Sequence, residues 1–133
     1  MADTLVTDTH AFLLHLTGDR KGLGSRALRA FDHADRGEGV ILVPVTSVQE
    51  VLDAEERGWV LLEDGPLAWT ARLRAHPGFD IAELSAEVLH RAAELSFLPD
   101  RSTRLIAATV LQHRGFLLTR DPAFERAGVP SVW

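Results

Sequence analysis

The sequence predicts an α/β fold, specifically a three-layer α/β/α sandwich on a mainly parallel sheet of four to five strands. Short runs that are apolar throughout alternate with longer stretches of helical spacing along the chain. This alternation is typical of a parallel sheet that helices cover on both faces. In addition, acidic residues stand where strand-like runs give way to helical ones, at what would be the carboxyl edge of such a sheet.

Length and composition limit the classes of protein to consider. The chain has 133 residues, which predicts one domain over 1–133, and its 46% hydrophobic and 25% charged residues are ordinary for a soluble globular protein. A net charge of −5 does not indicate the broad basic surface of many nucleic-acid binders. The absence of cysteine excludes disulfides and thiol catalysis. No apolar run approaches the roughly 18 residues of a membrane span, so we expect a cytoplasmic protein.

The first elements follow from apolar runs and their boundaries. Residues 4–7 predict a buried strand, and Asp8 is a natural N-cap for a helix from Thr9 to about Leu16. That helix is apolar around most of its circumference, so we expect the core to cover one side and a partner chain the other. A second helix over 25–35 precedes a strand over 40–43.

The later elements use similar signals. Ser47 and Glu50 have the spacing of a capping box, which predicts a helix that begins there and ends near Gly58. In the next helix, 66–75, we expect Leu67, Trp69 and Leu73 to be core residues. The remaining predicted elements are a strand over 79–84, helices over 85–95 and 100–114, a strand over 116–119, a helical turn at 121–122 and an edge strand over 131–133.

Four acids are candidates for one site. Asp8 and Asp121 follow predicted strands, Glu50 follows another by one turn, and Asp100 precedes the helix over 100–114. Because the carboxyl ends of parallel strands share one edge, we expect these carboxylates to meet in one pocket. Such a cluster repels itself unless a hard divalent cation binds, which points to Mg²⁺ or Mn²⁺ and to chemistry on a phosphate ester.

Each acid also has a purely structural interpretation. Asp8 and Asp121 could cap helices, Glu50 could complete the capping box with Ser47, and Asp100 could favour a helix dipole. The two interpretations are compatible, since parallel topology brings the capping positions themselves to one edge. Other chemistries lack their motifs: the sequence contains no HxxxH or HxH pair, no phosphate-binding glycine loop and no GxSxG elbow.

Five segments carry a family resemblance. The sequence resembles PIN-domain proteins, and within them the VapC-type ribonuclease toxins of bacterial toxin–antitoxin pairs, nearly from end to end. The matching segments are Val6-Thr7-Asp8-Thr9-His10-Ala11, Val43-Pro44-Val45-Thr46-Ser47-Val48-Gln49-Glu50, Arg104-Leu105-Ile106-Ala107-Ala108-Thr109, Leu117-Leu118-Thr119-Arg120-Asp121 and Gly128-Val129-Pro130-Ser131-Val132-Trp133.

The resemblance implies a fold, an activity and partners. It implies a small α/β/α sandwich that cleaves RNA with Mg²⁺ or Mn²⁺ held by three or four clustered acids. Asp8 matches the first acid, Glu50 the second and Asp121 the last, and we expect these three to hold the metal. The resemblance also implies a cognate antitoxin, and together with the apolar first helix it suggests a homodimer.

The third acid of the family pattern is missing. The family places an aspartate directly before the arginine of the R-x-I-A-A-T stretch, where this chain has Thr103. Asp100 is three residues earlier, on the same face of a helix at about 5–6 Å between Cβ atoms. Asp100 could therefore reach the pocket as a fourth catalytic acid, or it could only cap the helix.

Four further residues are expected to contact substrate or water. Thr119 and Thr103 could hydrogen-bond a metal-bound water or a phosphate oxygen, and Arg104 and Arg120 could neutralise the RNA backbone. The main alternative is a PIN-fold binding protein with a degenerate, inactive metal site, which acts through antitoxin or self association. Thr103 favours that alternative. An unrelated receiver-like domain is poorly supported, because Lys21, the only lysine, is misplaced for it.

Overall fold

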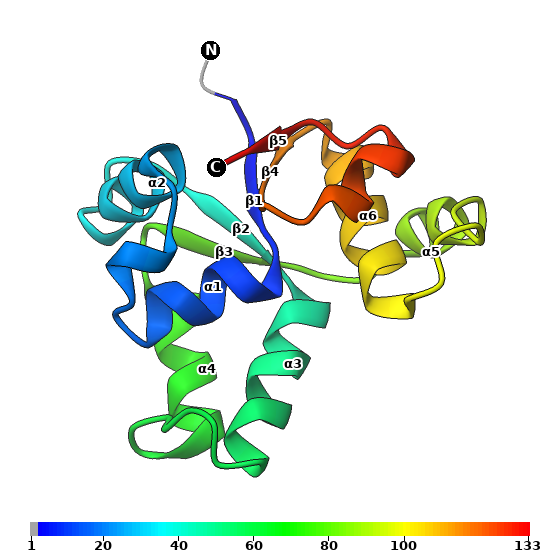
Figure 1. Ribbon diagram of the computed structural model, residues 1–133. Coiled ribbons are helices and arrows are strands. Elements are labelled where there is room, and N and C mark those ends of the chain that lie inside the picture. Colours follow the sequence, from blue (N-terminus) through cyan, green and yellow to red (C-terminus); the bar gives the residue numbers. More distant parts are fainter. Residues whose placement is uncertain (1–2) are drawn as a thin grey trace.

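A computed structural model describes residues 3–133. They form five strands, with one to three helical segments between successive strands, and Figure 1 shows their arrangement. The strands are β1 (Leu5–Thr7), β2 (Ile41–Pro44), β3 (Phe79–Ala82), β4 (Phe116–Leu118) and β5 (Ser131–Val132). The helices are α1 (Thr9–Leu16), α2 (Ser25–Asp35), α3 (Val45–Glu56), α4 (Gly65–Ala75), α5 (Ala86–Ala93) and α6 (Arg101–His113), with 3₁₀ turns η1 (Arg20–Gly22) and η2 (Pro122–Ala127).

The strands form one parallel sheet in the order β3-β2-β1-β4-β5. β1 is central, with Leu5 opposite Ile41 of β2 on one side and Phe116 of β4 on the other. The chain therefore builds the sheet outward from β1 in one direction and then in the other. Ligands of open α/β sheets bind at such a switch point, outside the carboxyl ends of the strands.

Helices cover both faces of the sheet, which confirms the predicted α/β/α sandwich. α1, α2 and α4 lie on one face and α5 and α6 on the other (Figure 1). Successive strand residues divide between the two cores: Leu117 of β4 packs with α5 and α6, whereas Leu118 packs with α1 and α2. This alternation follows from the two-residue period of a strand. Both faces are buried over most of the sheet, so β2 and β4 are apolar along their length, whereas β3 carries the exposed Asp80.

Several predicted boundaries are wrong. α3 begins at Val45, two residues before Ser47, so Ser47 is inside the helix and the predicted capping box does not form. β3 ends at Ala82 rather than residue 84, and residues 59–62 form neither helix nor strand. Pro44 ends β2 and starts α3 at once, because its fixed φ, here −55°, suits the first step into a helix.

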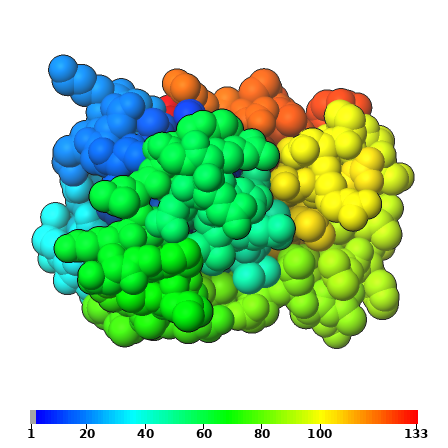
Figure 2. Space-filling model, turned by 90° about the horizontal axis from the view of Figure 1, so that it is seen from below, coloured from blue at the N-terminus to red at the C-terminus, as the bar shows by residue number. Residues whose placement is uncertain are grey.

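The exposed apolar surface is not where the sequence predicts it. On α1, Leu13, Leu14 and Leu16 are partly buried against the core, so this helix is not bare on one side. Leu67, expected in the core, is 89% exposed, and Leu61 is 92% exposed. Leu61 lies in the segment that joins α3 to α4, and Leu67 lies in the first turn of α4. This part of the chain is green in the view from below in Figure 2.

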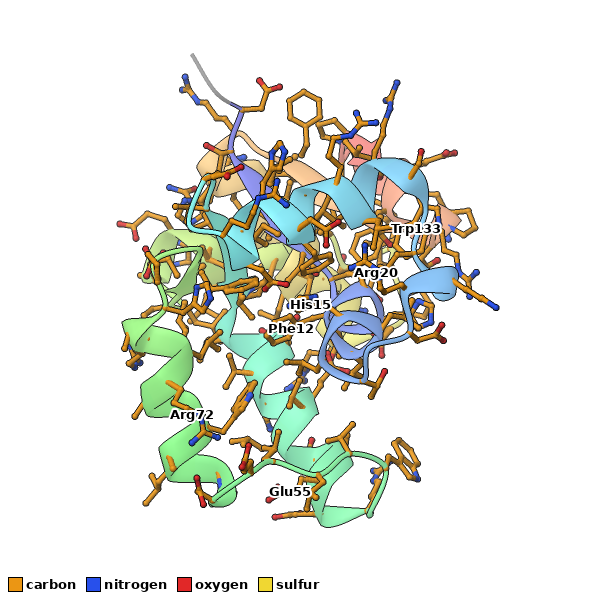
Figure 3. All side chains as sticks on the ribbon, turned by 90° about the vertical axis from the view of Figure 1, so that its left-hand side faces the viewer. Phe12, His15, Arg20, Glu55, Arg72 and Trp133 are labelled. Atoms are coloured by element: carbon orange, nitrogen blue, oxygen red, sulfur yellow. The ribbon has the colours of Figure 1, made fainter. Side chains whose placement is uncertain are left out.

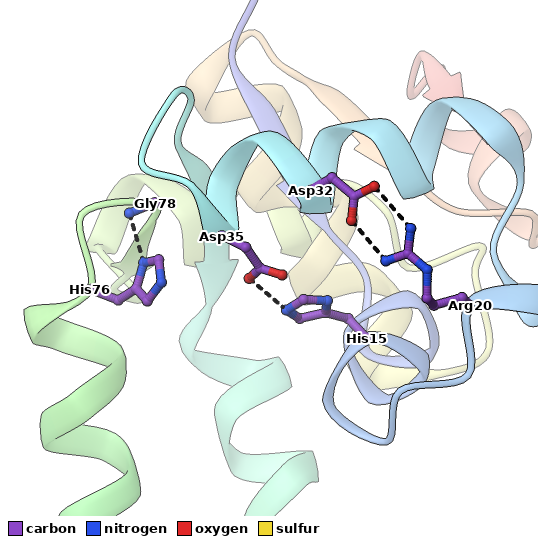
Figure 4. A network of polar contacts seen from close by, with 6 residues as sticks. All are labelled: His15, Arg20, Asp32, Asp35, His76 and Gly78. Carbon is purple, nitrogen blue, oxygen red and sulfur yellow. Dashed lines mark hydrogen bonds and ion pairs between the residues drawn. The ribbon is translucent and has the colours of Figure 1, made fainter.

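Polar contacts tie α1 to α2 beside the core. The His15 imidazole lies 3.2 Å from Asp35 and stacks on Phe31, with ring centroids 4.5 Å apart. Arg20 makes a two-pronged contact with Asp32, and the His76 ring accepts a hydrogen bond from the Gly78 amide, as Figure 4 shows. The His15 contacts with Asp35 and Phe31 join α1, which begins one residue after Asp8, to α2. In residues 3–133 no helix has the length and apolarity to cross a membrane.

Candidate active site

The four predicted acids meet at one cavity. Asp8, Glu50, Asp100 and Asp121 all line a hollow of about 170 Å³, together with Thr9, His10, Ser102, Thr103, Ile106 and Phe124. Asp8 follows β1 and Asp121 follows β4, and these two strands are neighbours in the sheet. The cavity thus lies at the carboxyl edge, where β1 meets β4. The structure thus places at one cavity the four acids that the sequence predicts to meet there.

Asp8 is the most buried of the four. It is the N-cap of α1, its Oδ1 accepts a hydrogen bond of 2.7 Å from the Ala11 amide, and the residue is 6% exposed. Its Oδ2 accepts a hydrogen bond from the Thr119 hydroxyl. Burial raises the pKa of the Asp8 carboxyl, because desolvation outweighs these two hydrogen bonds, and the charge of Asp121 raises it further.

Asp121 is connected to Asp8 through Thr119. The Asp121 amide donates a hydrogen bond of 3.1 Å to the Thr119 hydroxyl, which itself donates to Asp8. One oxygen of Asp121, Oδ1, caps the 3₁₀ turn η2 by accepting from the Ala123 amide at 2.9 Å. The other oxygen accepts no hydrogen bond from residues 3–133, and Asp121 is one of the residues that line the cavity.

Glu50 differs from the other acids because it caps nothing. It lies within α3, half-buried, and its Oε1 accepts a hydrogen bond of 2.7 Å from the Thr9 hydroxyl. Burial is the main reason that the pKa of Glu50 is raised, and Asp100, Asp53 and Asp8 add to it by repulsion. A half-buried, repelled carboxylate inside a helix destabilises the fold without giving the helix a cap in return.

Asp100 and Thr103 act together. Asp100 is the N-cap of α6, and its Oδ2 accepts from both the amide and the hydroxyl of Thr103, at 2.9 and 2.8 Å. Both residues also line the cavity. The structure therefore places Asp100 in both of its expected positions at once, as a helix cap and as a carboxylate at the pocket. Thr103 directs its hydroxyl to Asp100 rather than into open space.

The other predicted contact residues, namely Thr119, Arg104 and Arg120, have three different environments. Thr119 is buried and touches Asp8, so it positions a carboxylate, and it does not line the cavity. Arg104 is turned away: its guanidinium donates to the carbonyls of Leu98 and Ser96, in the segment between α5 and α6. Arg120 is exposed and lies over the Trp133 indole, 5.8 Å from its centroid.

From the sequence, no site role was assigned to Thr9, His10 or Trp133. His10 lines the cavity, and its ring is nearly parallel to the Trp133 indole, at 11° between planes and 6.5 Å between centroids. No motif marks Trp133, because its position depends on β5 pairing with β4 at the far end of the chain. The position of Thr9, directly after Asp8, was the available signal.

The four acids form no ion pair within residues 3–133, although the charge of the nearby His10 lowers the pKa of Asp8. None of the five ion pairs in that part of the chain includes one of the four acids. At the same time, no three Asp, Glu or His side chains of residues 3–133 stand close enough together to hold a metal ion as they are. Each acid has at least one oxygen held by a hydrogen bond. The donors are Ala11 for Asp8, Thr9 for Glu50, Thr103 for Asp100 and Ala123 for Asp121.

Three solved structures share this fold over nearly the whole chain. The chain superposes on VapBC2 from Rickettsia felis, bound to a promoter DNA fragment, with a TM-score of 0.71 at 11% identity over 97% of both chains. For FitAcB from Neisseria gonorrhoeae the TM-score is 0.67 at 20% identity, over 98% of this chain and 97% of that one. A toxin–antitoxin complex from Klebsiella pneumoniae gives 0.63 at 20% identity over the same shares.

These similarities establish the fold. They cover nearly the whole chain, and they agree with the PIN-like architecture that the resemblance implies. No protein-family model and no curated protein sequence matches the chain. The activity must therefore be argued from the residues at the cavity.

Proposed function

We propose that this protein is a metal-dependent endoribonuclease and the toxin component of a toxin–antitoxin pair. The observation that carries the proposal is Glu50: a half-buried carboxylate with a raised pKa, inside a helix, facing Asp8 and Asp100 without a cationic partner in residues 3–133. Such a group destabilises the fold, and functional sites are where such groups are retained.

The donor set fits a hard divalent cation in its chemistry. Carboxylate oxygens are the preferred protein ligands of Mg²⁺, and Mn²⁺ accepts the same donors. We assign Asp8, Glu50 and Asp121 as the residues that hold the cation, with Asp100 as a further acid at the cavity. A bound cation would polarise the phosphodiester and lower the pKa of a water molecule bound to it. Because three acids do not converge in the structure as described, binding requires small rotations of these side chains.

The chain's own residues have distinct roles in this proposal. Glu50, with its raised pKa, takes the proton of the water that attacks phosphorus. Thr119 holds Asp8 in place, and the Thr9 hydroxyl orients Glu50. Arg120, exposed next to Asp121, offsets the negative charge of the approaching RNA backbone. Arg104 has no such role, since its guanidinium is engaged by two carbonyls.

The proposed partners are an antitoxin and a second copy of the chain. The similar structure from Klebsiella pneumoniae supports an antitoxin partner, since it is described as a toxin–antitoxin complex. Trp59, Leu61 and Leu67 give this chain exposed apolar surface that a protein partner would cover. Mass measurement by light scattering, with and without the neighbouring gene's product, tests both associations.

Calorimetric titration with Mn²⁺, paired with a cleavage assay on single-stranded RNA, tests the activity. We expect millimolar or tighter binding that Asp8→Asn and Glu50→Gln each weaken at least tenfold, and cleavage that both variants abolish. Asp80→Asn is the matched control, because Asp80 is exposed on β3 and does not line the cavity. Full cleavage by Asp8→Asn would contradict the mechanism.

A second candidate function is a PIN-fold binding protein without activity. Thr103 in place of an acid, hydrogen-bonded to Asp100, and the lack of three convergent acids favour it. The same titration separates the two functions. No heat of binding at millimolar Mn²⁺, together with tight association with an antitoxin, would support the binding protein and exclude the nuclease.

A further inference from the structure

Three side chains from distant segments form a stacked cluster beside the acidic cavity. His10 is the second residue of α1, Arg120 follows β4, and Trp133 follows β5. The His10 ring is within 11° of parallel to the indole, and the Arg120 guanidinium lies 5.8 Å from the indole centroid. His10 lines the cavity with Asp8, and Arg120 precedes Asp121 in the chain.

Trp133 is held rigidly in this cluster by its backbone. Its carbonyl accepts a hydrogen bond of 2.9 Å from the Ala27 amide, and the Thr119 amide donates to the carbonyl of Val132 at 3.1 Å. Figure 3 shows Trp133 beside the start of α2, where its carbonyl group and its indole leave no room for a Cβ at Gly24. An aromatic ring fixed in this way loses little conformational freedom when a ligand stacks on the cluster.

The composition of the cluster favours a nucleobase over a protein. Two aromatic faces and a guanidinium are the groups on which unpaired bases stack. Aliphatic side chains, which a protein partner would cover, are not part of it. Within residues 3–133 the large apolar side chains exposed to solvent are elsewhere, namely Val40, Trp59, Leu61, Leu67, Leu84, Leu89 and Phe97.

We propose that His10, Trp133 and Arg120 form a stacking subsite for one unpaired base of an RNA strand whose adjacent phosphate lies at the acidic cavity. The subsite rests on the proposed ribonuclease function and adds to it a position that recognises one base, which must be unstacked because the faces of a base inside a duplex are covered by its neighbours. Arg120 contributes twice, by its charge toward the backbone and by its planar face toward the base.

Binding of a labelled RNA octamer to the Asp8→Asn variant, followed by fluorescence anisotropy, tests the subsite without cleavage. One abasic nucleotide is placed at each position in turn. We expect one position at which loss of the base weakens binding by about 5- to 150-fold, the range for one stacked base. In Asp8→Asn combined with His10→Ala or with Trp133→Leu, the same abasic substitution should change affinity less than twofold. Thermal unfolding checks that Trp133→Leu is folded.

Matched controls come from groups outside the cavity. His113 is exposed at the end of α6, and Arg126 lies over Phe97 at the same 5.8 Å as Arg120 over Trp133. His113→Ala and Arg126→Ala should keep the full abasic effect. An abasic effect that persists without His10 and Trp133, no sensitive position, or no binding of the octamer would each overturn the subsite. Cleavage by the unmodified protein with Mn²⁺ judges the ribonuclease proposal separately.

Discussion

The Thr119 hydroxyl donates a hydrogen bond to Oδ2 of Asp8, although 111 residues separate them in the chain. The two side chains meet because β1 and β4 are neighbours, with Thr7 opposite Leu118 in the register. The same hydroxyl accepts from the Asp121 amide at 3.1 Å. A single buried threonine therefore sets the relative position of two of the proposed metal ligands.

Thr119→Val should destabilise the protein and impair the site. The change leaves Oδ2 of Asp8 and the Asp121 amide without their partner, which costs about 1–3 kcal/mol in unfolding free energy. It should also raise the pKa of Asp8 further, since the Thr119 hydrogen bond lowers it. Urea unfolding measures the first effect and Mn²⁺ titration the second. Thr119→Ser keeps the hydroxyl and serves as control; equal losses in Ser and Val would contradict this role.

Asp8→Asn should stabilise the fold at neutral pH in the absence of divalent cations. The folded-state pKa of Asp8 lies above its ordinary value of 3.8, so the native state binds more protons than the unfolded state as pH rises from there. Stability then falls with rising pH until the raised pKa is passed. The unfolding free energy of Asp8→Asn should exceed that of the wild type by an amount that grows as pH increases from 4 to 7. Both are measured with EDTA present. A constant difference would exclude ionisation of Asp8 as its cause.

Thr9→Val should shift the titration of Glu50 upward. The Thr9 hydroxyl stabilises the ionised carboxylate at 2.7 Å, and this hydrogen bond lowers a pKa that burial raises. Without it, the acid limb of the cleavage pH profile should move to higher pH, while the rate on the plateau changes less. Thr9→Ser should restore the wild-type profile. An unchanged acid limb in Thr9→Val would assign the base role to another group.

Arg104→Ala should lower stability and leave RNA affinity unchanged. The guanidinium holds the carbonyls of Leu98 and Ser96, and loss of these charged hydrogen bonds costs about 1–3 kcal/mol. Arg120→Ala should instead weaken RNA binding and leave stability unchanged, since Arg120 is exposed beside the cavity. Urea unfolding and anisotropy with the RNA octamer separate the two effects. Weaker RNA binding by Arg104→Ala at full stability would return Arg104 to the substrate-contact role that the sequence predicts.

Local signals in the sequence were enough to predict most of the fold. The α/β/α layers follow from apolar strand runs and helical stretches in alternation, and Asp8, Asp100 and Asp121 are helix caps as their neighbours predict. The shared position of the acids also follows, because parallel strands end at one edge. The start of α3 was misplaced because Ser47, a favourable cap in isolation, lies after Pro44 has already begun the helix.

Features that depend on distant contacts could not be predicted. Leu67 has helical spacing with Trp69 and Leu73, yet it faces solvent, because only one side of α4 meets the sheet. Arg104 is drawn to carbonyls that become available only where the chain turns between α5 and α6. The stack of His10 on Trp133 joins two residues whose approach requires the full order of the sheet.

Glu50 offers a means to distinguish active from inactive members of a lineage. Asp8, Asp100 and Asp121 each cap a helix or turn, so a descendant that lost its activity would keep them for folding alone. Glu50 caps nothing, and its repulsion by Asp8 and Asp100 disappears when it becomes glutamine or leucine. Mutational drift in an inactive descendant should therefore remove this residue first. Position 50 is therefore the one to compare when homologous sequences are sorted by activity.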